Sequence, residues 1–118
     1  MFTATKEQKN EILSKQTTII NILTEKRSNL LNLIQYCTSS SEIDEVKKWI
    51  GDSDNFISLM ECHRNKTLDN YNTTNEAGSS FQEIMDDLSK IETIENDLLS
   101  KSKQMLNLYI QRYNHINN

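Results

Sequence analysis

The stretch from Lys6 to Cys37, KEQKNEILSKQTTIINILTEKRSNLLNLIQYC, decides the fold. Apolar residues recur in it every three, four or seven positions: Ile12, Ile19, Leu23, Leu30, Ile34 and Cys37. This spacing places them on one face of a helix with 3.6 residues per turn. Four more apolar residues flank that row: Ile20, Ile22, Leu31 and Leu33. Because the apolar face is wide, the sequence predicts a long helix that is covered by more than one partner helix.

Two further stretches keep helical spacing. In the second stretch the apolar row is Ile43, Val46, Ile50, Ile57, Met60, Leu68 and Tyr71. In the third it is Ile84, Leu88, Ile91, Leu98, Met105, Tyr109 and Ile116. Glu95 and Ser102 interrupt this last row with polar side chains. The pattern predicts two more long helices.

Polar residues separate the three stretches. The run from Thr38 to Ser41 consists of hydroxyl residues, which favour turns and caps, and Ser41 is the predicted N-cap of the second helix. Residues 70–79 are rich in Asn and Thr and are predicted to form a connecting loop. Ser80 and Glu83 have the spacing of a capping box, which predicts where the third helix begins.

These elements predict an all-α fold, an elongated antiparallel bundle of three long helices. The helices cover about 6–37, 42–70 and 80–116, and residues 1–118 form a single domain. An alternative stays open, because Gly is costly inside a helix and the next four residues are good caps. In that alternative the chain is a long helical hairpin that turns near Gly51.

Composition limits the function. The 118 residues carry 13 basic and 17 acidic side chains and a net charge of -4, which gives no basic surface for nucleic acid. No apolar run approaches the length of a membrane span, and no apolar segment near the N-terminus has the form of a secretory signal. We therefore expect a cytoplasmic protein, with export without a cleavable signal peptide as the alternative.

The sequence predicts no catalytic, metal or cofactor site and therefore no enzyme. Neither His63 nor His115 belongs to a motif for nucleophilic catalysis. Cys62 lies beside His63, but adjacent helical residues point about 100° apart and cannot converge on one metal ion. Cys37 and Cys62 are the only cysteines, and two cysteines do not make a disulfide framework, so reduced thiols are expected.

Trp49 is the residue with the strongest functional signal. A single Trp in an amphipathic helix fills space between helices, but Trp is also enriched as an anchor at protein interfaces. Phe56 lies seven residues further on and shares the face of Trp49 if the helix is unbroken. Both interpretations, core and anchor, remain open from the sequence.

The stretch Trp49-Ile50-Gly51, with Phe56 after it, resembles the WxG signature of the WXG100 family. In length the chain is similar to the YwqH-like accessory proteins encoded beside LXG toxins in bacterial type VII secretion loci. The resemblance implies a WxG at the turn of a helical hairpin. It also implies pairing with a second small helical protein or with the helical N-terminal domain of a toxin. The chain differs from the family in lacking its export signal Tyr-x-x-x-Asp/Glu, because Tyr113 and Asn117 stand four residues after Tyr109 and Tyr113.

A second resemblance competes with the first. The chain also resembles the end of one spectrin repeat running into the first helix of the next. The residues that carry this resemblance are Lys26-Arg27 and Leu30, followed by the stretch from Val46 to Ile50 with its Trp. This resemblance implies a structural or scaffolding module. We expect a helical interaction protein that acts as an accessory partner of a type VII secreted toxin. The alternatives are the spectrin-like module, an antitoxin-like helical binding protein and, for the oligomeric state, a homodimer.

Overall fold

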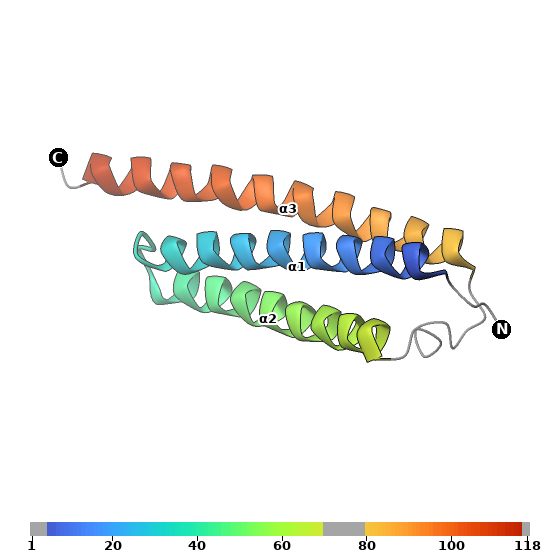
Figure 1. Ribbon diagram of the computed structural model, residues 1–118. Coiled ribbons are helices and arrows are strands. Elements are labelled where there is room, and N and C mark those ends of the chain that lie inside the picture. Colours follow the sequence, from blue (N-terminus) through green and yellow to red (C-terminus); the bar gives the residue numbers. More distant parts are fainter. Residues whose placement is uncertain (1–4, 70–79, 117–118) are drawn as a thin grey trace.

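The computed structural model describes residues 5–69 and 80–116 (Figure 1). It confirms the all-α fold with three long helices: α1 (Lys6–Ile34), α2 (Ser40–Asp69) and α3 (Phe81–Ile116). The molecule is elongated and measures 62 × 19 × 18 Å. The helices agree with the predicted ranges to within a few residues, and the loop predicted at 70–79 lies outside the described residues.

Local hydrogen bonds explain where α1 begins and ends. The Thr5 hydroxyl accepts from the Gln8 N–H, and the Gln8 side chain accepts from the Thr5 N–H, which makes a capping box. At the other end, the N–H groups of residues 35–37 donate to carbonyls three residues earlier, so the last turn is tightened. The helix therefore ends at Ile34, and Cys37 lies just beyond it.

The N-cap of α2 differs from the expectation. Helix α2 begins at Ser40, and the hydroxyl of Ser39 accepts from the Glu42 N–H at 3.2 Å. Ser41 was predicted as the cap, but it lies inside the first turn, because any residue of a hydroxyl run can cap and tertiary packing selects one of them. At the start of α3, the Ser80 hydroxyl accepts from the Glu83 N–H at 3.2 Å, as predicted.

Helix α2 continues unbroken through Gly51, so the alternative of a hairpin turning there is wrong. Ile50 and Ser53, on either side of it, are buried against the rest of the bundle. Their packing offsets the cost of a helical Gly, which is about 1 kcal/mol. A Cβ atom added at Gly51 would have nothing within 4 Å, so neither a turn nor a close approach requires a glycine there.

Helix α1 lies between the other two helices (Figure 1). It packs along both α2 and α3, whereas α2 and α3 make at most slight contact with each other. Helix α2 runs antiparallel to α1 and α3, which are parallel to one another. The expectation that more than one helix covers the wide apolar face of α1 is confirmed.

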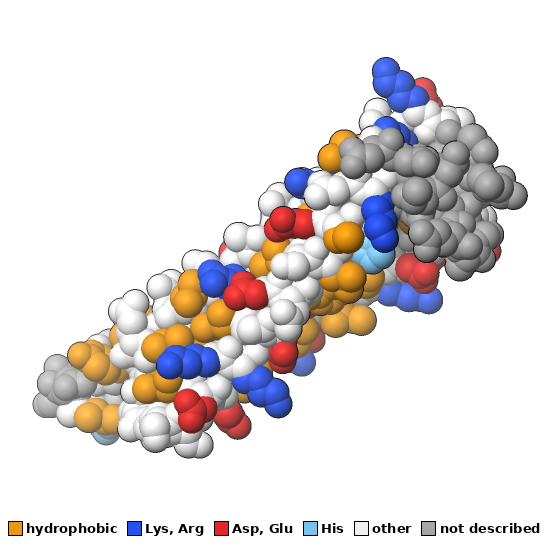
Figure 2. All heavy atoms as spheres, turned by 90° about the horizontal axis from the view of Figure 1, so that it is seen from below, with side chains coloured by type: hydrophobic (Ala, Val, Ile, Leu, Met, Phe, Trp, Pro, Cys, Tyr) orange, Lys and Arg blue, Asp and Glu red, His pale blue; other side chains and the backbone are white. Residues whose placement is uncertain are grey.

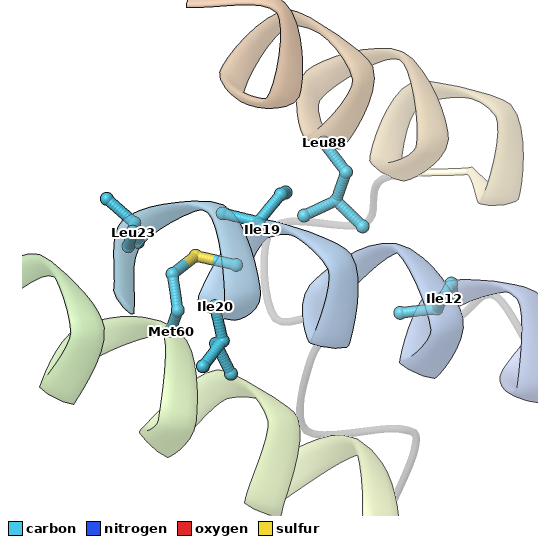
Figure 3. Close-up of a cluster of buried hydrophobic side chains, with 6 residues drawn as sticks. All are labelled: Ile12, Ile19, Ile20, Leu23, Met60 and Leu88. Atoms are coloured by element: carbon cyan, nitrogen blue, oxygen red, sulfur yellow. The ribbon is translucent and has the colours of Figure 1, made fainter. Parts of the chain in front are cut away.

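The core forms two apolar clusters along α1. One contains Ile12, Ile19, Ile20, Leu23, Met60 and Leu88. Figure 3 shows this cluster, with Ile19 on the side of α3 near Leu88 and Ile20 directed toward α2. The other cluster contains Leu30, Leu33, Val46 and Ile50. The first cluster joins all three helices, with Leu88 from α3, whereas the second joins α1 to α2 and has α3 side chains only at its edge.

Candidate protein-interaction groove

A groove of about 530 Å³ runs between α2 and α3, over α1. We call it the α2–α3 groove. Six apolar residues line it: Leu30 from α1, Trp49 and Phe56 from α2, and Ile94, Leu98 and Met105 from α3. Nearly all of its surface is apolar. Seen from the side of α2, hydrophobic side chains run along the molecule between charged ones (Figure 2).

The groove exists because α3 has two apolar rows and α1 covers only one of them. The side chains of α3 buried against α1 belong to Leu88, Glu95, Leu99 and Ser102. The second row includes Ile94 and Leu98, which are rotated away from α1 and are 59% and 40% exposed. An uncovered apolar row of this kind is typical of a surface that binds a protein.

The floor of the groove also contains polar side chains that pair with one another. Lys26 of α1 forms an ion pair with Glu95 at 3.0 Å, and their side chains are only 13% and 3% exposed. Asn29 of α1 donates to the Ser102 hydroxyl at 3.1 Å. Glu95 and Ser102, which interrupt the apolar row in the sequence, thus fix the register of α3 on α1. Because these polar groups hydrogen-bond to one another, the rest of the groove surface is available for apolar contacts.

The two rims of the groove carry opposite charges at the same level. Trp49 and Met105 both line the groove and pack against the same cluster, so they lie at a similar level on α2 and α3. Asp52 is three residues from Trp49, and Lys101 is four residues from Met105; since the helices are antiparallel, both steps lead in the same direction. Asp52 of α2 and Lys101 of α3 therefore line the groove from its two sides at a similar level. Lys101 also forms an ion pair with Asp97 of its own helix at 3.1 Å, and both side chains are exposed to solvent.

The structure brings together two of the three residues that the sequence singled out for partner binding. Trp49 is half-buried, packs against the cluster at Leu30 and lines the groove, so it combines the core and the surface interpretations. Phe56 shares its face, as an unbroken helix predicts. Gly51 is exposed and does not line the groove.

The contribution of α3 is what sequence reasoning missed. The sequence places Leu98 and Met105 in the predicted core row, and the same pattern does not include Ile94 or Lys101. A signal was present: positions 94, 98, 101, 105 and 108 follow one another at steps of three and four and share a helix face. The sequence pattern alone does not reveal that α2 and α3 are separated in the bundle.

A charged cluster clamps the far end of α3 to the connection between α1 and α2. The guanidinium of Arg112 donates to both carboxylate oxygens of Glu42 at 2.9 Å and to the Tyr36 carbonyl at 3.0 Å. It lies 4.3 Å from the centre of the Tyr109 ring. The hydrogen bonds from Arg112, followed by that from the Thr38 N–H, lower the pKa of Glu42 to about 2. Glu42 is therefore ionised at neutral pH and serves as a structural anion.

The remaining candidate side chains are two cysteines and two histidines. Burial, followed by the charge of Glu42, raises the pKa of the Cys37 thiol, so this cysteine stays protonated. Cys62 and His63 are exposed on α2, and His115 is exposed near the end of α3. Within residues 5–69 and 80–116, no three His, Cys, Asp or Glu side chains come close enough to hold a metal ion.

Comparisons of the chain with known protein families, curated proteins and solved structures found no match. No helix in the described part of the chain is both long and apolar enough to cross a membrane. The functional conclusion therefore depends on the α2–α3 groove.

Proposed function

We propose that this chain is a non-enzymatic interaction protein that receives a helix of another protein in the α2–α3 groove. The observation that carries the proposal is the gap between α2 and α3, whose walls bear half-exposed large apolar side chains. A fourth helix in this position would complete a four-helix bundle and remove the apolar surface from water. Burial of apolar surface stabilises a complex by about 25 cal/mol per Å², before the entropic costs of association.

The proposed partner is the helical N-terminal domain of a type VII secreted toxin, for which the chain would act as an accessory or targeting protein. The resemblance of Trp49-Ile50-Gly51 to the WxG signature supports this choice, together with the position of Trp49 in the groove. One feature speaks against it, because Gly51 lies in mid-helix and not at the turn of a hairpin.

The alternative of a spectrin-like module is consistent with the order of the three helices. Such a module is expected to be a stable monomer that binds no partner helix in the α2–α3 groove. The row at Ile94 and Leu98, half-exposed along the middle of α3, favours the binding proposal over this alternative.

A paired capture experiment tests the proposed function. The tagged chain and its Leu98→Asp variant are recovered from the native cell, and the bound proteins are identified by mass spectrometry. Leu31→Asp is the matched control, because Leu31 is 42% exposed and Leu98 is 40% exposed, while Leu31 lies outside the groove. We expect a toxin with a helical N-terminal domain to be bound by the wild type and the control and lost from Leu98→Asp.

Two results would contradict the proposal. If Leu98→Asp retains the same partner as the wild type, the partner binds elsewhere on the chain. If only cytoskeletal proteins or nothing above background is recovered, the accessory role is wrong.

A further inference from the structure

We propose that a second copy of this chain covers the α2–α3 groove when no other partner is bound, in a dimer whose two-fold axis runs along the helices. The inference does not depend on the proposed function, because it uses only the shape, apolarity and charge of this face. In this dimer α3 of each copy lies over α2 of the other.

The first argument is the apolar row on α3. Ile94, Leu98, Met105 and Leu108 are spaced by steps of four, seven and three residues, so they share one face of the helix over about 21 Å. Leu108 is 63% exposed and Ile94 is 59% exposed. The chain therefore carries the kind of amphipathic helix face that the groove accepts.

The second argument is that the face is complementary to itself. The rim of α2 carries Asp52, and the rim of α3 carries Lys101 at the same level. A two-fold axis along the groove exchanges the two rims, so Asp52 meets Lys101 of the partner subunit and Lys101 meets Asp52 of the partner subunit. One Asp–Lys ion pair forms on each side of the apolar centre of the interface.

The charges also select this axis over the other arrangement of two facing grooves. A two-fold axis perpendicular to the helices would set α2 over α2 and α3 over α3. When that axis crosses the level of Asp52 and Lys101, Lys101 faces the partner's Lys101 and Asp52 faces the partner's Asp52. Like charges that face each other at an interface are unfavourable, so the axis along the helices is preferred.

The third argument concerns the area. A face two helices wide and about 25 Å long covers on the order of 500 Å² in each copy. The total of about 1,000 Å² is at the lower limit for a specific interface. The dimer is therefore expected to be weak and reversible, so that a tighter partner can displace it.

Sedimentation equilibrium of the full chain tests the proposal over about 1 µM to 500 µM. We expect a reversible monomer–dimer equilibrium in the wild type. Leu98→Asp should raise the dissociation constant by at least about a hundredfold, because the symmetry places two carboxylates in the apolar centre. Leu31→Asp, of the same chemistry and similar exposure but outside the groove, should leave the constant unchanged.

Exchanging the rim charges tests the geometry. Each of the single variants Asp52→Lys and Lys101→Asp replaces two attractive pairs with two repulsive ones and should weaken the dimer about tenfold or more. The double variant restores opposite charges across the interface and should recover most of the affinity. Circular dichroism of each variant confirms that the helices remain folded.

Several outcomes would overturn the inference. A chain that stays monomeric to the highest concentration excludes the dimer, and it leaves the proposed function to its own test. A dimer that Leu98→Asp does not weaken uses another surface. A double charge variant no tighter than the single variants contradicts the proposed axis.

Discussion

Helices α1 and α3 are both long and amphipathic, but the bundle covers them differently. Helix α1 has neighbours on two sides, and seven of its Ile and Leu side chains are buried: Ile12, Ile19, Ile20, Ile22, Leu23, Leu30 and Leu33. Of the four buried residues of α3, two are polar, Glu95 and Ser102. The exposed large apolar residues of α3 include Ile94, Leu98 and Leu108. A buried apolar residue on α1 is therefore expected to contribute to stability, whereas one on the outer row of α3 is expected to contribute to the proposed binding.

The largest effect is expected from truncation of a core residue of α1. Leu23 is fully buried, so Leu23→Ala should lower the free energy of unfolding by about 3 kcal/mol, as cavities do in other cores. Leu108→Ala, at 63% exposure, should change it by less than about 0.5 kcal/mol. Urea unfolding followed by circular dichroism of dilute protein measures both. Equal losses for the two variants would show that the helices are covered alike.

The polar contact between α1 and α3 should give the next effect. Glu95→Leu leaves the ammonium group of Lys26 largely buried without a partner, which should cost about 3 kcal/mol at most. The double variant Lys26→Met, Glu95→Leu removes both charges and should be as stable as the wild type or more stable. Thermal unfolding of the two variants provides the comparison. If the single variant is as stable as the double, the ion pair is not desolvated.

Gly51→Ala should have a smaller effect with the opposite sign. The added methyl group meets no atom within 4 Å, and Ala is a better helix former, so the chain should gain about 0.5–1 kcal/mol. The same unfolding measurement applies. A loss of stability would indicate that Gly51 forms a turn, as the hairpin resemblance implies.

The smallest effect at neutral pH is expected at the clamp of Glu42 and Arg112. The pKa of Glu42 is about 2, below its usual value of 4.5. The stability that the ionised Glu42 gives to the folded protein is therefore fully present above about pH 4.5. This stability is lost as the pH falls from about 4.5 to about 2, because Glu42 takes up a proton more readily in the unfolded chain than in the folded protein. Glu42→Gln should remove this part of the pH dependence of the melting temperature. Parallel curves for variant and wild type would mean that the clamp is not formed.

Periodicity predicted the three helices, since the apolar rows and the capping residues act locally. It also placed Trp49 and Phe56 on one face and marked Glu95 and Ser102 as unusual. The sequence could not show how far α2 stands from α3, because that separation depends on side chains of all three helices packing together. For the same reason Leu98 was assigned to the core, although it lies 40% exposed at the edge of the groove.

The single tryptophan offers the most direct test of an open groove. Trp49 is the only Trp of the chain, so acrylamide quenching of its fluorescence reports on this surface alone. We expect Trp49 to be accessible to the quencher in dilute protein and to become shielded as the concentration rises, while Leu98→Asp stays accessible throughout. A Trp49 that is fully shielded even in dilute protein would contradict the account, because the groove would then be closed within the monomer.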